Sequence, residues 1–229
     1  MTMRTRTLSL AVASALVLAG CGSGGSDDEG VADLSATKLI STAKKQLGQE
    51  DNVRIKGKGS DEGQEIEVDI GFAGGDAEGS VTASGQTLGV LKADGKSYFK
   101  ADAKFFESSG APAEAARTIG GKWVLIDPNN ADFAELGNFV SKDKFVDELL
   151  DPEGKVKKGK EKKVNGVDCV TLKDGEGTLY LDKEDGRPVS LVSEGGSDGE
   201  GTLNFTYEKV DPVEAPAASE VVDLASLGG

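Results

Sequence analysis

Cys21 is the residue whose type and surroundings most clearly indicate chemistry. It follows Leu18, Ala19 and Gly20, so one branched apolar residue and two small residues precede a thiol. Small side chains let the backbone enter a peptidase site, and a thiol is nucleophilic enough to take up a diacylglyceryl group. We therefore predict cleavage before Cys21 and attachment of acyl chains to its sulfur. A chance cysteine behind an ordinary secretory signal is the alternative.

The residues before Cys21 have the layout of an export signal. Arg4 and Arg6 precede an apolar run over residues 8–18. This run is too short to span a bilayer, because a spanning helix needs ~20 apolar residues. Together with Cys21, the segment resembles the lipobox signal of bacterial lipoproteins. We expect residues 1–20 to be a signal peptide, and the protein to be exported and lipid-anchored to the outer face of the cell membrane.

Composition divides the rest of the chain into two parts. Residues 21–33 are small, polar and acidic, which predicts a lipidated, flexible tether. Residues 34–229 are enough for a single domain, which we expect to be a monomer. Residues 1–20 hold two arginines and no acid, so their removal changes the net charge from -14 to -16. Such a charge disfavours nucleic acid as a partner.

The residue types argue against catalysis. The chain contains no histidine, which removes the usual general base and the commonest zinc ligand. Acidic pairs such as Asp27-Asp28 lie in predicted tether and turn segments, and no twelve-residue loop carries alternating oxygen ligands. We predict a protein that is not an enzyme, with no catalytic residue, metal or cofactor. Cys169 lies in an alternating segment and is predicted to be a small buried apolar residue, with a reactive thiol as the alternative.

Apolar periodicity predicts an α+β fold. A helix should start after Ser35 and end at Gly48, and a period of two from residue 53 to residue 99 predicts a meander of strands. Short helices are expected at residues 103–108, 113–118, 131–138 and 142–150, with one strand at 122–127. Further strands are expected at 155–164, 167–172, 178–182, 188–193 and 202–210. The whole would be a curved antiparallel sheet (a half-barrel) of about ten strands, wrapped around a few short helices.

Two groups of side chains are candidates for binding. The first is a set of six apolar residues, three of them aromatic, which could line or gate a cavity because large side chains are scarce in this chain: Ile66, Val68, Ile70, Phe72, Phe99 and Trp123. The second is a set of lysines on one predicted strand: Lys155, Lys157, Lys158, Lys160, Lys162 and Lys163. These lysines either protect a sheet edge from aggregation or contact lipid head groups and the membrane.

Several segments together resemble the LppX/LprG-type, LolA-like envelope lipoproteins of actinobacteria. The similar segments are residues 121–124, 164–169, 179–182 and 186–189, which read Gly-Lys-Trp-Val, Val-Asn-Gly-Val-Asp-Cys, Leu-Tyr-Leu-Asp and Gly-Arg-Pro-Val. The resemblance covers most of the chain after Cys21. It implies a half-barrel sheet around helices with a hydrophobic cavity for acyl chains, and it brings no catalytic residues.

The resulting hypothesis is a membrane-anchored lipoprotein that carries or shields the acyl chains of a membrane lipid or lipoglycan. Burial of each methylene group would supply ~0.8 kcal/mol of affinity. The alternative is a non-catalytic envelope sensor or partner-binding lipoprotein with a filled core. An unfilled apolar cavity of several hundred Å³ would favour the carrier over the sensor.

Overall fold

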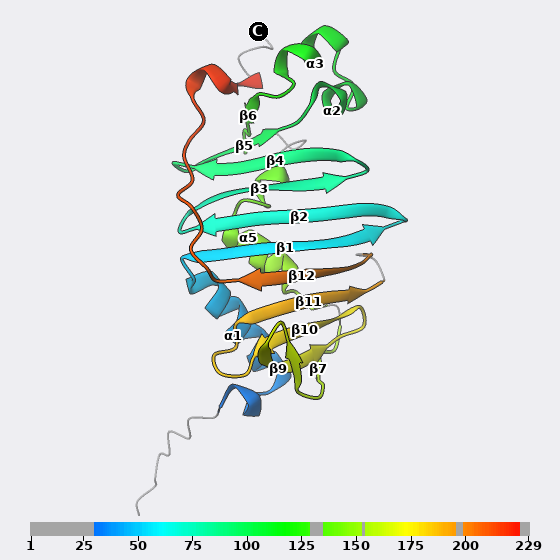
Figure 1. Ribbon diagram of the computed structural model, residues 1–229, viewed down its shortest axis with the longest axis vertical. Coiled ribbons are helices and arrows are strands. Elements are labelled where there is room, and N and C mark those ends of the chain that lie inside the picture. The colour runs from blue at the N-terminus through cyan, green and yellow to red at the C-terminus, as the bar shows by residue number, and fades with distance from the viewer. Residues whose placement is uncertain (1–29, 129–134, 153, 196–198, 225–229) are drawn as a thin grey trace, which may run out of the picture.

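The computed structural model describes residues 30–128, 135–152, 154–195 and 199–224 (Figure 1). These residues form one large curved sheet with a few short helices, which confirms the predicted α+β class. Cys21, the signal segment and most of the predicted tether lie outside the described residues. None of the described helices is long and apolar enough to cross a membrane.

The first half of the sheet is a meander of five antiparallel strands. It comprises β1 (Asn52–Asp61), β2 (Gln64–Ala73), β3 (Asp76–Ala83), β4 (Gln86–Ala93) and β5 (Lys96–Lys100). The turns are two residues long, and Ser84-Gly85 and Asp94-Gly95 both have positive φ at each position. Positive φ at both central residues is what a tight hairpin turn requires.

The second half adds eight strands of two to seven residues. They are β6 (Trp123–Leu125), β7 (Lys157–Lys158), β8 (Lys162–Val164), β9 (Val167–Lys173), β10 (Gly177–Asp182), β11 (Pro188–Glu194), β12 (Glu200–Thr206) and β13 (Val221–Val222). The order in the sheet is β13-β6-β5-β4-β3-β2-β1-β12-β11-β10-β9-β7, with β8 also paired to β9. All pairs among the described strands are antiparallel except β13 with β6. Because β12 pairs with β1, strands from both halves of the chain meet in mid-sheet.

Helices cover one face of the sheet. Figure 1 shows α1 (Ala36–Gln49) and α5 (Lys142–Leu149) behind the strands, while α2 (Ala103–Ser108) and α3 (Ala113–Ile119) lie near β5 and β6. Short 3-10 helices occur at η1 (Val31–Asp33), η2 (Glu135–Gly137) and η3 (Ala218–Glu220). The Ser35 hydroxyl accepts a hydrogen bond from the Lys38 amide at the start of α1. Leu39, Ala43 and Leu47 of α1 are fully buried, as its apolar stripe predicts.

The buried side chains form three clusters. The largest packs α1 and α5 on the inner face of β1, β2 and β9 to β12. A second joins Phe99 of β5 to α2 and α3. A third lies on β4, β5 and β6 and includes Leu91 and Tyr98, with Val213 and Val221 from the C-terminal segment packed against it. The sheet therefore has apolar contacts on both faces at its β5-β6 end.

Several predicted boundaries differ from the structure. Residues 31–33, predicted as tether, form η1, because Val31 and Ala32 pack against the main core. Helix α1 continues past Gly48 to Gln49, and β12 stops at Thr206. The predicted helix at 131–138 falls partly outside the described residues, and its end forms η2.

The predicted lysine strand at 155–164 is divided into β7 and β8. Lys158 of β7 pairs with Leu172 of β9, and Lys162 of β8 pairs with Cys169 of β9. The two lysines are four residues apart in the sequence, whereas their partners on β9 are three residues apart. One extra residue is thus inserted around Gly159, whose amide donates to the Thr171 carbonyl. A bulge of this kind twists an edge strand and discourages pairing with another chain.

Candidate ligand cavity

A cavity of about 500 Å³ lies between the inner face of the sheet and α5 with the residues that follow it. Its floor comes from β1, β2, β10, β11 and β12, and Ile40 of α1 contributes to its wall. The volume lies within the ~300–1,000 Å³ of typical small-molecule sites. The apolar lining residues are Ile40, Ile66, Val68, Phe139, Phe145, Leu149, Leu150, Pro152, Val156, Leu172, Leu179, Leu191, Val192 and Leu203.

Glycines make room for the cavity floor. Gly57 and Gly59 of β1 pair with Val68 and Ile66 of β2, and Gly59 also pairs with Gly201 of β12. A Cβ atom on Gly57 would lie 2.0 Å from the Thr202 carbonyl oxygen, so no other residue fits this backbone without movement. Side chains are therefore missing from both strands where Gly59 of β1 meets Gly201 of β12.

The floor and the helical wall present apolar side chains that are not fully buried. Ile66, Val68, Leu149, Leu191 and Leu203 all line the cavity and all keep an intermediate degree of exposure. Covering apolar surface of this kind gains roughly 25 cal/mol per Å². The interior of the cavity is thus suited to a ligand with an apolar chain.

Charged residues also border the cavity, and most of them are acidic. The described lining residues include Lys58 and five carboxylates, which are Glu148, Asp151, Asp174, Glu176 and Glu200. The Asp174 carboxylate accepts hydrogen bonds from the amides of Glu176 and Gly177, which holds the turn between β9 and β10. The Lys58 ammonium pairs with Glu67, and Glu200 accepts a hydrogen bond from Ser60, so these two charged side chains have partners on the neighbouring strands.

The predicted cavity residues fall into three places. Ile66 and Val68 line the cavity. Ile70 and Phe72 continue the same face of β2 but lie in the packed core, where they are 0% and 1% exposed. The Phe72 ring lies 5.9 Å from the ring of Phe145 on α5. The apolar stripe is thus divided between cavity floor and core.

Phe99 and Trp123 do not line the cavity, contrary to the sequence prediction. Phe99 is fully buried against α2, with its ring centroid 5.8 Å from that of Phe106. Trp123 packs with the cluster that contains Leu91 and Tyr98, and the Lys100 ammonium lies 5.5 Å from its ring centroid. The reason is topological, because β5 and β6 lie several strands away from the strands that form the cavity.

Sequence reasoning missed the cavity residues of the second half of the chain. Phe139 and Leu149 come from the segment around α5, and Leu191 and Leu203 come from β11 and β12. Alternation marks Leu191 and Leu203 as inward-facing, but it does not distinguish cavity from core. Their pairing with each other places them together on the floor.

The six predicted lysines are all exposed, and none of them is among the described cavity-lining residues. They lie at the β7-β8 edge of the sheet. The Lys158 ammonium donates to the carbonyls of Ala32 and Leu34, and Lys162 lies 5.5 Å from the centroid of the Tyr180 ring. Lys158 thus lies against the start of the described chain, and of the described residues in this segment Val156, not a lysine, lines the cavity.

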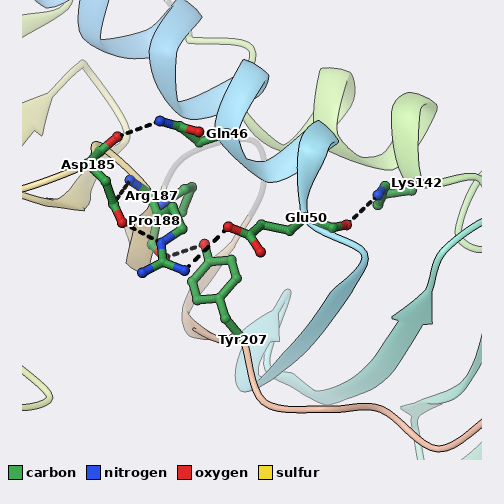
Figure 2. Close-up of polar contacts among 7 residues, drawn as sticks. All are labelled: Gln46, Glu50, Lys142, Asp185, Arg187, Pro188 and Tyr207. Atoms are coloured by element: carbon green, nitrogen blue, oxygen red, sulfur yellow. Dashed lines mark hydrogen bonds and ion pairs between the residues drawn. The ribbon is translucent and has the colours of Figure 1, made fainter.

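A polar cluster fixes the end of α1 to the sheet (Figure 2). Arg187, in the turn after β10, places Nη1 3.3 Å from Glu50 Oε1 and Nε 2.7 Å from Asp185 Oδ2. Its guanidinium lies 4.7 Å from the centroid of the Tyr207 ring, and the Tyr207 hydroxyl donates to the Pro188 carbonyl at 2.7 Å. Burial raises the pKa of Tyr207 far above its usual range. The phenol is thus held neutral as a hydrogen-bond donor.

Two further bonds connect this cluster to the helices. The Gln46 side-chain amide donates to the Asp185 carbonyl at 3.0 Å, and the Lys142 ammonium donates to the Glu50 carbonyl at 2.6 Å. Both bonds are drawn in Figure 2. They hold α1 against the β10-β11 turn and α5 against α1. The Gly-Arg-Pro segment therefore positions the helices that cover the cavity and does not itself line it.

The thiol of Cys169 is buried within β9. The residue is 0% exposed, and its Sγ lies 3.4 Å from the Val167 carbonyl oxygen, to which it donates. Burial raises the pKa of this thiol, which makes the reactive thiolate less accessible. Across the described ranges, no three His, Cys, Asp or Glu side chains gather closely enough to hold a metal ion.

Comparisons with known proteins give structural similarities only. No protein-family model matches the chain, and no curated protein matches its sequence. LprF from Mycobacterium bovis is similar in structure, with a TM-score of 0.49, 12% identity, and coverage of 80% of this chain and 97% of that one. An uncharacterized conserved protein from Thermus thermophilus has a TM-score of 0.41 and 12% identity, with 82% and 98% covered. MucB in complex with MucA(peri) has a TM-score of 0.40 and 14% identity, with 77% of this chain and 57% of that chain covered.

Proposed function

We propose that this protein is a non-catalytic, membrane-anchored lipoprotein that binds an acyl chain of a membrane lipid or lipoglycan in the cavity. One observation carries the proposal, namely a cavity of about 500 Å³ lined by partly exposed apolar side chains. A sensor with a filled core would place side chains in this volume. Glycines occupy the floor instead, at Gly57, Gly59 and Gly201.

The size of the cavity matches a single acyl chain. If a methylene group takes about as much space as a liquid water molecule, ~30 Å³, a volume of about 500 Å³ holds roughly 16 such groups. At ~0.8 kcal/mol per group, the gross gain is about 13 kcal/mol. The cost of ordering the chain and ligand lowers the net value substantially. Affinity in the micromolar to nanomolar range remains compatible with these magnitudes.

Binding is tested on the purified protein. The exported chain is isolated without denaturant, and native mass spectrometry and solvent extraction then identify any bound lipid. We expect at most one acyl chain in the cavity, and uptake of a fluorescent fatty acid after the bound lipid is removed. Absence of bound lipid, combined with no fatty-acid binding up to about 100 µM, would refute the proposal. A Kd above about 100 µM corresponds to a binding free energy weaker than about 5.5 kcal/mol, far below the gain expected from filling the cavity.

Anchoring through Cys21 is tested separately. The intact mass of membrane-extracted protein should correspond to a chain that begins at Cys21 and carries acyl groups. A Cys21→Ser variant should lose this added mass and leave the membrane fraction, while its domain still binds the fatty acid. An unmodified Cys21 in the mature protein would refute the anchor without affecting the cavity proposal.

A further inference from the structure

One edge of the sheet concentrates positive charge in an acidic protein. We call residues 155–163 the basic edge. They contain six lysines and one acid, Glu161, and thus carry a net charge of +5, whereas the whole chain carries -14. All six lysines are exposed.

Protection of a sheet edge accounts for part of this pattern. Lys157, Lys158, Lys162 and Lys163 lie on β7 and β8, where charge discourages pairing with another chain. Lys155 and Lys160 lie outside both strands, and the bulge at Gly159 already disturbs the edge. The lysines thus extend beyond what edge protection requires.

Nearby acids are paired with lysines. Glu161 forms an ion pair with Lys183 at 2.6 Å, and Asp168 lies 3.6 Å from Lys163. These contacts leave most lysines of the basic edge directed to solvent. An anionic surface approaching this edge would therefore meet ammonium groups first.

The start of the described chain lies against the basic edge. Lys158 donates to the carbonyls of Ala32 and Leu34, which flank the end of η1. Figure 1 shows η1 at the same end of the molecule as β7 and β9. Eight residues, 22–29, lie between the predicted anchor at Cys21 and Gly30. Even fully extended, they span at most ~30 Å.

We propose that the basic edge docks on an anionic lipid bilayer and sets the orientation of the domain on its membrane. The chain leaves the domain at this edge, and a lysine near an anionic membrane surface is attracted to it. Val156, between Lys155 and Lys157, lines the cavity. Docking thus places this wall of the cavity toward the bilayer. The proposal concerns a surface outside the cavity and does not require ligand binding.

Lysine footprinting tests the docking directly. Protein purified with its anchor is reconstituted into vesicles of phosphatidylcholine alone or with about 30% phosphatidylglycerol, and acetylation of each lysine is followed by mass spectrometry. We expect the basic edge to react at least ~3-fold more slowly on phosphatidylglycerol vesicles. High salt should abolish the difference, because it screens charges beyond a few Å. Exposed lysines elsewhere, Lys96, Lys104 and Lys209, should react equally on both.

A matched pair of variants distinguishes an effect of charge at the basic edge from an effect of the net charge of the protein. The triple variant Lys157→Glu, Lys160→Glu, Lys162→Glu should remove the protection of the remaining edge lysines. The triple variant Lys96→Glu, Lys104→Glu, Lys209→Glu changes the net charge equally and should retain the protection. Circular dichroism establishes that both variants fold.

Equal reactivity of the basic edge on both kinds of vesicle would overturn the proposal, and so would equal loss of protection in the two variants. A protein that carries no acyl mass refutes the anchor alone. Docking is then measured by flotation with excess vesicles, where only vesicles with phosphatidylglycerol should retain the protein. Failure of the cavity to bind fatty acid leaves the footprint unchanged.

Discussion

Replacing Val68 with phenylalanine should shorten the acyl chain that the cavity can accept. Val68 lies on the cavity floor opposite Gly57, and its side chain keeps partial exposure to the cavity. The larger ring therefore has space in the cavity itself and need not enter the core. The substitution fills volume without removing any polar contact.

The expected loss follows from the volume that the ring occupies. Phenylalanine has about four more carbon atoms than valine, so it displaces about four methylene groups of a chain that fills the cavity. At ~0.8 kcal/mol per group, this is about 3 kcal/mol, or a roughly 100- to 200-fold weaker Kd. A chain too short to fill the cavity should lose little.

A series of fatty acids of increasing length measures this effect. In the parent protein, binding free energy should become more favourable with each added carbon up to about 16 carbons and then level off. In Val68→Phe, the plateau should begin at about 12 carbons, while chains of about ten carbons bind equally well to both proteins. Isothermal titration or displacement of a fluorescent fatty acid gives the Kd values.

Val167→Phe provides the matched control. Val167 lies at the start of β9, is partly exposed and does not line the cavity, so this variant should keep the parent plateau. An unchanged plateau in Val68→Phe, or the same shift in both variants, would show that acyl chains do not occupy this cavity.

Three further predictions concern stability and reactivity. Gly57→Ala forces a Cβ atom against a backbone carbonyl and should lower the free energy of unfolding by about 2–3 kcal/mol, or Tm by about 5–10 °C. At Gly48 an added Cβ atom meets nothing within 4 Å, so Gly48→Ala should be neutral or slightly stabilising. Thermal unfolding measures both variants. Because burial raises the pKa of Tyr207, the unfolded chain ionises first, and stability should fall above pH ~10 by up to about 1.4 kcal/mol per pH unit. Tyr207→Phe should remove that slope in urea titrations and cost about 1 kcal/mol at neutral pH. Iodoacetamide at about pH 8 should modify Cys169 slowly in the folded protein and rapidly in urea, and rapid native labelling would contradict its burial.

Many elements follow from local residue patterns. The predicted helix at 103–108 coincides with α2, where the Asp102 carboxylate accepts a hydrogen bond from the Phe105 amide. The Asn165-Gly166 turn has positive φ at both residues, as its composition predicts. Such features depend on neighbours within a few residues, so the sequence is sufficient to locate them.

The bulge in the lysine segment is a feature that local sequence patterns could not predict. Residues 155–164 have the composition of one edge strand, yet β7 and β8 pair with β9 in registers that differ by one residue. The shift depends on Gly159 and its contact with Thr171 of another strand. No pattern within the segment contains that information.

The sequence alone determined the α+β class, most helix and strand positions, and the inward face of β2, because each depends on the periodicity of contiguous residues. Tertiary structure decided which inward side chains border a cavity. Ile66 and Val68 do so because Gly59 and Gly57 lie opposite them and Gly201 follows on β12. Phe99 has the same apolar character but lies under α2. The empty volume depends on the register between strands that lie far apart in the sequence: Gly59 of β1 pairs with Gly201 of β12, more than 140 residues later. Local periodicity cannot predict that register.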